Sequence, residues 1–161
     1  MDRYVELLPP ALRNRVFAIT ALEWIALDDA LACYAACDAL DLPGEQQREI
    51  GRVVSSANNG ALLETLARLA GKLGATPWLT LRNMDKVWLR SNRGGGVAVY
   101  KVSDRSARIE LWRVPLVVSP FFCVSLCGAV EGGLELFRRS ASVVEAREEH
   151  RRDGLTLTAS W

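Results

Sequence analysis

Apolar positions in the first half of the chain recur every three or four residues, which is the period of an amphipathic helix. This pattern predicts helices over about residues 28–40, 45–56 and 59–73. A fourth helix is expected after Thr76-Pro77, because threonine caps a helix and proline suits its first turn. The second of these helices is expected to bury three apolar residues, Ile50, Val53 and Val54.

The first 25 residues do not follow this pattern. Pro9-Pro10 rules out one continuous helix, and Val16–Trp24 is apolar enough that another part of the protein should cover it. A chain of 161 residues has the length of one domain. We therefore divide it into residues 1–25, an N-terminal extension or first helix, and residues 26–161, a single α+β domain.

After Arg93 the apolar period changes to two, which is typical of half-buried strands. A glycine turn at Gly94–Gly96 precedes this part, and a longer hairpin connection is expected at Asp104–Ser106. Strands are expected over residues 97–100, 107–112, 143–150 and 155–161, with a long helix over residues 119–138. The fold class is therefore α+β: N-terminal helices followed by β-β-α-β-β, a four-stranded antiparallel sheet packed on a long helix.

Composition and charge exclude several classes of protein. Half of the residues are apolar, which is too many for a disordered chain. Twenty basic and nineteen acidic residues leave a net charge of +1, so we expect no nucleic-acid partner. A basic row at Arg82, Lys86 and Arg90 is interpreted as a solvated helix face rather than an anion site. We find neither a signal-peptide pattern nor an apolar run long enough to cross a membrane, and we expect a cytoplasmic protein.

Catalytic and metal-binding patterns are scarce. The only histidine, His150, lies among charged residues, so a histidine-based triad or a zinc–histidine set is not expected. Cysteines occur in two pairs four residues apart, Cys33 with Cys37 and Cys123 with Cys127. We interpret them as packing residues, with metal or redox chemistry as the alternative. We expect no enzyme, cofactor or metal; a thiol nucleophile at Cys123 or Cys127 is a further alternative, and it requires a low thiol pKa.

The long helix carries a face of small residues, Cys123, Cys127, Gly128, Gly132 and Gly133. Such a face suits tight packing on the sheet, a ligand channel or a dimer seam. Apolar ligand pockets are rich in aromatic residues, and the chain has five tryptophans. The candidates for a pocket wall are Trp78, Trp88, Trp112, Phe122, Cys123 and Cys127.

Four stretches within residues 76–161 carry a family resemblance. They are the segment MDKVWLRSNRGGG, the strand and turn of Ser106–Pro115, the pattern C-x3-C-G-x3-G-G-x-L-E within Phe121–Phe137, and the strand pair of Val143–Trp161. In these features the chain resembles the ligand-binding domain shared by heme–nitric-oxide sensors, 4-vinyl-reductase-type sensor domains and TRAPP Golgi-transport subunits. The nearest likeness is to a paralogous bacterial family abundant in myxobacteria.

The resemblance implies a sensory or regulatory domain without enzymatic activity, which acts as a homodimer and holds a small hydrophobic ligand between helices and sheet. The alternative is a ligand-free adaptor that docks a protein partner. The zinc cysteines of the vinyl-reductase type would correspond to His150 and Thr158, on either side of Gly154, so this metal site is lost. The Tyr-x-Ser-x-Arg motif of the heme sensors is also missing.

Overall fold

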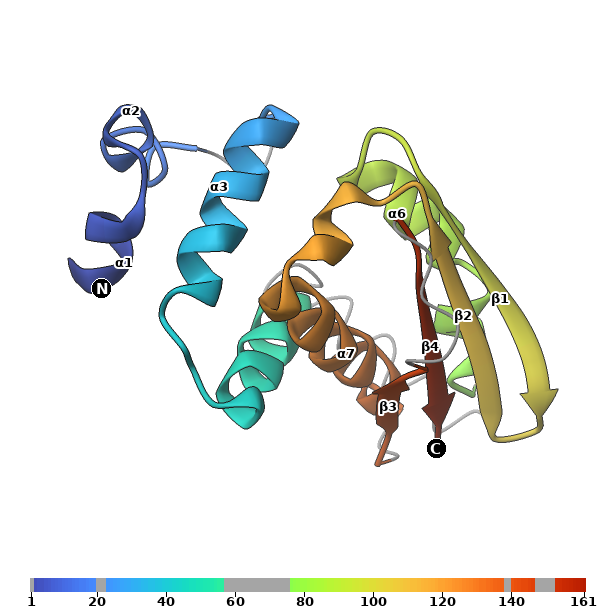
Figure 1. Ribbon diagram of the computed structural model, residues 1–161. Helices are drawn as coiled ribbons and strands as arrows, with labels where there is room; N and C mark the ends of the chain where they lie inside the picture. Colours follow the sequence, from blue (N-terminus) through green and yellow to red (C-terminus); the bar gives the residue numbers. More distant parts are fainter. Residues whose placement is uncertain (1, 20–22, 57–75, 138–139, 147–152) are drawn as a thin grey trace.

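The computed structural model describes residues 2–19, 23–56, 76–137, 140–146 and 153–161 (Figure 1). Residues 44–56 are also helical and carry no label in the figure. The labelled elements are α1 (Asp2–Leu7), α2 (Pro10–Arg13), α3 (Leu27–Asp38), α5 (Trp78–Leu81), α6 (Met84–Ser91), β1 (Gly96–Ser103), β2 (Ser106–Trp112), η1 (Pro115–Val118), α7 (Pro120–Glu135), β3 (Ser142–Glu145) and β4 (Leu155–Ser160). The predicted α+β class and the β-β-α-β-β order are confirmed.

The four strands form one antiparallel sheet in the order β1-β2-β4-β3. The predicted alternation holds in β2, where Ala107, Ile109 and Leu111 are buried. Ile109 pairs with Val99 on one side and with Leu157 on the other, so these apolar side chains share the inner face of the sheet. β1 and β2 are joined by a two-residue turn, because Ser103 pairs with Ser106; the longer connection predicted here is wrong.

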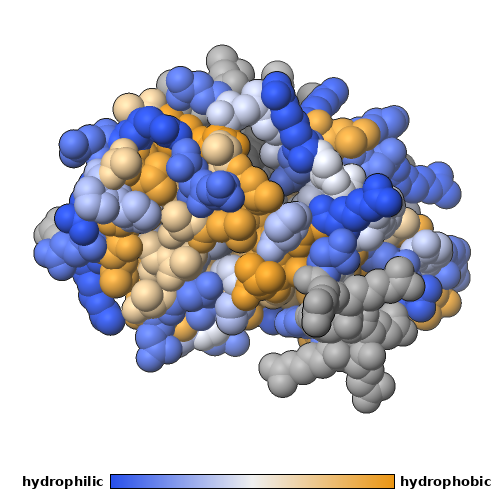
Figure 2. Space-filling view, turned by 45° about the horizontal axis from the view of Figure 1, so that its top comes forward, coloured by the Kyte–Doolittle hydropathy of each residue, from blue (hydrophilic) through white to orange (hydrophobic). Residues whose placement is uncertain are grey.

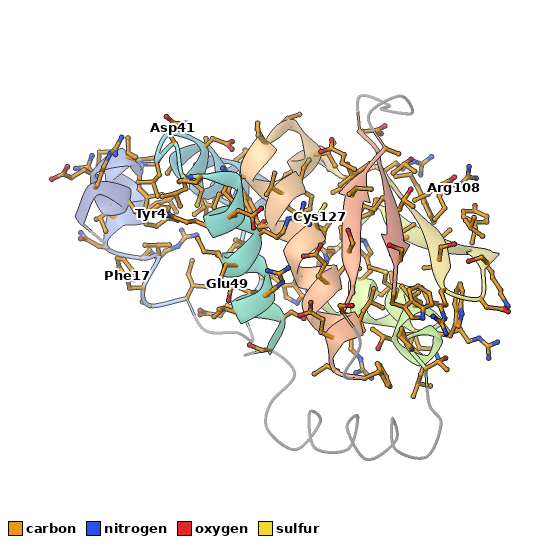
Figure 3. All side chains as sticks on the ribbon, turned by 90° about the horizontal axis from the view of Figure 1, so that it is seen from below. Tyr4, Phe17, Asp41, Glu49, Arg108 and Cys127 are labelled. Atoms are coloured by element: carbon orange, nitrogen blue, oxygen red, sulfur yellow. The ribbon has the colours of Figure 1, made fainter. Side chains whose placement is uncertain are left out.

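In the part of the chain that the structure describes, α6 and α7 pack on this inner face (Figures 1 and 3). α7 lies over β3 and β4, and α6 lies along β1. Ser119 caps α7 by accepting a hydrogen bond from the Phe122 N–H at 3.1 Å, and Pro120 occupies its first turn, as predicted. The core between α7 and the sheet includes Leu134, Ile109, Leu157, Val143 and Leu155, all almost fully buried.

The predicted fourth helix is two short helices, α5 and α6, separated by a turn at residues 82–83. Leu81 is buried in the core, and Trp88 packs at its edge with Met84. After the break, α6 lies along β1, whereas Trp78 of α5 contacts Trp161 and the β1–β2 turn. The predicted helix over residues 59–73 and the residue His150 lie outside the described residues.

The helix over residues 44–56 crosses α7 very closely. A Cβ atom built on Gly51 would lie 1.8 Å from the carbonyl oxygen of Ser125, and one built on Gly128 would lie 1.9 Å from that of Arg48. Only glycine permits this approach. The small face of α7 therefore serves tight packing, but Gly128 packs against a helix and not against the sheet as predicted.

Two predictions of burial are wrong. Ile50, Val53 and Val54 are exposed, because residues 44–56 turn Gly51 and two arginines toward α7 instead of this stripe. Phe17 and Trp24 are also exposed, so the apolar segment near residue 20 is not covered as a whole.

α1 and α2 pack against α3 and form a second, smaller core of Leu8, Leu12 and Ala36. We call α1, α2 and α3 the N-terminal unit, and the remaining elements the sheet unit. Among the described residues, no helix is long and apolar enough to cross a membrane.

Candidate functional site

The two units meet at a small set of side chains on α3 and α7. Tyr34 lies edge-on to Phe122, with ring centroids 5.3 Å apart and planes at 89°, and its ring is 6.3 Å from that of Phe121. Asp38 accepts a hydrogen bond from the Phe121 N–H at 2.8 Å, so its carboxylate faces the N-terminus of α7. We call Tyr34, Asp38, Phe121 and Phe122 the α3–α7 seam.

The seam is apolar apart from this one hydrogen bond. Burial raises the pKa of Tyr34 above its usual value, with Cys37 and Cys33 adding to the shift, so its hydroxyl stays protonated. Aromatic pairs of this geometry contribute about 0.5–1.5 kcal/mol beyond the burial of their area. The seam therefore joins the units through ring contacts and one hydrogen bond.

Apolar side chains extend from the seam to the surface. η1 contacts both α3 and α7, and its last residue, Val118, is 68% exposed. Leu27 lies two turns before Tyr34 on the same side of α3 and is also exposed. Figure 2 shows apolar atoms gathered on the part of this face that belongs to the N-terminal unit. Exposed apolar side chains of η1 and α3, Val118 and Leu27, thus lie on the elements that form or adjoin the seam.

A second contact between the units lies farther along the chain. The guanidinium of Arg93, after α6, stacks 4.4 Å from the ring centroid of Trp24, which precedes α3. The other predicted basic positions, Arg82, Lys86 and Arg90, are exposed, as expected for a solvated helix face. Arg93 thus joins the segment after α6 to Trp24 by a cation–π contact.

The six predicted pocket residues do not gather at one place. Phe122, Cys123 and Cys127 lie in the main core, and Trp78 and Trp88 pack at its edge. Trp78 lies edge-on to Trp161 at 5.2 Å, near the β1–β2 turn. Trp112 follows the buried Leu111 in β2, so its side chain lies on the opposite face of the sheet. There its ring covers Gly96, its partner on β1. Only Phe122 belongs to the seam.

Cys123 and Cys127 are buried in the main core. Burial raises the pKa of Cys123 to about 12, with Glu145 adding to the shift, and burial raises the pKa of Cys127 to about 11. A nucleophilic cysteine needs a lowered pKa. The pKa values of Cys123 and Cys127 are raised, so the low pKa that the thiol-nucleophile alternative requires is not found. Cys33 packs in the N-terminal core, apart from Cys123 and Cys127. In the described ranges, no group of histidine, cysteine and acidic side chains is arranged to hold a metal ion.

The sequence did not indicate a buried ion-pair network that joins residues 44–56 to α7. Glu131, only 3% exposed, accepts hydrogen bonds from Arg48 at 2.6 Å and from Arg52 at 2.7 Å. It also accepts the Val143 N–H at 2.9 Å, while Arg48 donates to the Val143 carbonyl at 2.8 Å. The one available signal is the position of Glu131 in an otherwise apolar stretch of α7.

Comparison with solved structures finds H-NOX proteins with a similar fold. The chain is similar to an Fe(II) unliganded H-NOX protein from K. algicida, with a TM-score of 0.68, 11% identity, and coverage of 99% of this chain and 84% of that one. A structure from a study of heme distortion in the H-NOX family matches with a TM-score of 0.61 and 18% identity. The match covers 98% of this chain and 85% of that chain. For an H-NOX variant from T. tengcongensis the values are 0.56 and 20%, with coverage of 97% and 87%. No family model and no curated protein matches the chain.

These neighbours share the fold of the whole chain, as the resemblance to heme–nitric-oxide sensors implied. Heme iron is held in proteins by histidine, a cysteine thiolate, methionine with histidine, or tyrosine. Among the described residues there is no histidine, Cys123 and Cys127 are buried in the main core, and Tyr34 packs edge-on against Phe122. His150 lies outside the described residues. The described residues therefore do not fit heme, and we assign it no role.

Proposed function

We propose that this chain is a sensory or regulatory domain without enzymatic activity that binds a small apolar molecule at the α3–α7 seam. The molecule replaces heme as the ligand of this fold. The observation that carries the proposal is the seam itself: Tyr34 packs on Phe121 and Phe122 between two separate cores.

The chemistry of the seam defines the class of ligand. Its side chains present rings and aliphatic surface, and the Asp38 carboxylate is already engaged by the Phe121 N–H. An uncharged or weakly polar molecule with an aromatic or aliphatic body fits these surfaces. Binding changes how the N-terminal unit sits on α7, and this change is the signal that the domain transmits.

The experiment is a fluorescence titration with Nile red, an uncharged apolar dye, on the whole chain. We expect saturable binding, and we expect Val118→Asp to weaken it about tenfold, because a carboxylate beside the seam must lose water when the dye binds. Val144→Asp is the matched control: Val144 is 53% exposed, on the edge strand β3 away from the seam. Dye binding that is absent, or that both variants weaken equally, would contradict the proposal.

The alternative is a ligand-free adaptor, in which the same apolar surface docks a protein. Exposed Phe17 and Trp24 on the N-terminal unit favour this alternative. An adaptor would give no saturable dye binding, whereas a ligand domain would give a defined stoichiometry. The titration therefore separates the two functions.

A further inference from the structure

The segment from α5 to the turn after α6 concentrates positive charge on the surface. Residues 78–93 include four basic residues and one acidic residue, whereas the whole chain has a net charge of only +1. Arg82, Lys86 and Arg90 are exposed. Within the described ranges, no carboxylate forms an ion pair with any of these three side chains. Their positive charge is thus available to an anionic partner.

Two exposed apolar side chains lie beside these charges. Val87 is 58% exposed and Leu89 is 65% exposed, and both belong to α6. Positions three residues apart on a helix are neighbours, so Leu89 lies next to Lys86 and Val87 lies next to Arg90. Trp88 packs inward at the edge of the main core. The outward face of α6 therefore combines basic and aliphatic side chains.

An exposed tryptophan extends the same surface. Arg93, which follows α6, lies 4.4 Å from the ring centroid of Trp24, and Trp24 is still 47% exposed. Tryptophan is enriched where proteins meet the boundary between lipid and water, because its ring is apolar and its N–H is polar. We call the following residues the α6 surface: Trp24, Lys86, Val87, Leu89 and Arg90.

We propose that the α6 surface docks on an anionic lipid layer. The headgroups of such a layer supply negative charge to Lys86 and Arg90. Val87, Leu89 and Trp24 enter the headgroup region, as the apolar side chains of interfacial helices do.

The other anionic partner to consider is an acidic protein segment. A protein segment that binds as a helix is held in an apolar groove. The α6 surface is instead the convex outer side of a helix, and a fluid lipid layer adapts to a convex shape. The geometry therefore favours lipid.

The test is co-sedimentation of the whole chain with vesicles. One set is pure phosphatidylcholine, and the other contains about 30% phosphatidylserine in about 0.1 M salt. We expect binding to the anionic vesicles to be about tenfold tighter than to the neutral ones, and to weaken as salt is added. One unit of charge near an anionic surface changes binding about fivefold, so Arg90→Glu should weaken it about 25-fold. Leu89→Asn keeps the charge and should weaken binding about fivefold.

Arg3→Glu is the matched control. It makes the same change in net charge on an exposed residue of α1, which lies at the opposite end of the molecule from α6 (Figure 1). Charges farther away than about 10 Å are screened at this salt concentration, so the control should bind like the parent chain.

Three results would overturn the proposal: no binding to anionic vesicles, equal binding to both kinds of vesicle, or equal weakening by Arg3→Glu and Arg90→Glu. Unchanged binding of Leu89→Asn would also contradict it. If Arg90→Glu fails to fold, hydrogen exchange of the parent chain decides: vesicles should slow exchange in α6 and leave α1 unchanged. The dye titration contains no vesicles, so either proposal can fail without the other.

Discussion

The N-terminal unit and the sheet unit are stabilised by different kinds of contact. Within the sheet unit, residues 44–56 are joined to α7 by a backbone crossing at Gly51 and Gly128 and by the buried Glu131. The N-terminal unit has a small core around Leu8 and Leu12. Rings and one capping hydrogen bond join it to α7.

This difference predicts which part of the molecule can move. Buried ion pairs and backbone contacts have narrow geometry, whereas ring contacts tolerate small displacements. The seam should therefore open at a lower free energy than the sheet unit unfolds. A ligand site at the seam would use this difference: the sheet unit stays rigid while the N-terminal unit responds.

The largest effect is expected from Glu131→Ala. It leaves Arg48 and Arg52 without their buried partner and frees the Val143 N–H, so the free energy of unfolding should fall by about 3 kcal/mol. Urea unfolding followed by circular dichroism measures this change. Glu49→Ala is the control, because Glu49 is an exposed partner of the same Arg52 and should cost less than about 1 kcal/mol. Equal losses in both variants would show that the buried network does not stabilise the sheet unit.

Gly128→Ala should have the next largest effect. Its methyl group would meet the Arg48 carbonyl, so the helices must separate and the free energy of unfolding should fall by about 2 kcal/mol. Gly132→Ala, one turn later on α7, meets its nearest atoms at 3.4 Å and should be neutral or stabilising by up to about 1 kcal/mol. Thermal unfolding of both variants checks the difference. The same sign for both would contradict the close crossing.

Tyr34→Ala should have a smaller and local effect. Loss of two ring contacts should lower the free energy of opening of the N-terminal unit by about 1–2 kcal/mol. Hydrogen exchange should then speed up in α1, α2 and α3 and stay unchanged in β2 and β4. Tyr34→Phe, which keeps the ring, is the control. Uniform acceleration across the whole chain would show that the two units open together.

The parts of the fold that could be predicted are those that the local pattern controls. Alternation in β2 and the Ser119-Pro120 start of α7 appear where the sequence places them. The break between α5 and α6 was not predictable from the apolar period, which runs through both helices without interruption. The exposure of Ile50 was also not predictable, because α7 packs against the Gly51 side of this helix and leaves Ile50 at the surface.

The candidate site was predicted only in part. Phe122 was identified as a pocket residue, but Tyr34 was not, because its role depends on where α3 meets α7. Trp112 lies on the far side of the sheet, since alternation in β2 turns it away from Leu111. Composition can point to aromatic side chains, but the contact between distant helices decides which of them form the seam.

The central claim, that this fold is used here to bind an apolar molecule other than heme, is tested most directly by native mass spectrometry. The purified chain is measured intact and again after denaturation, together with its visible absorption. We expect a small organic mass that is lost on denaturation, and neither a heme mass nor a Soret band. One equivalent of heme with a Soret band would contradict it.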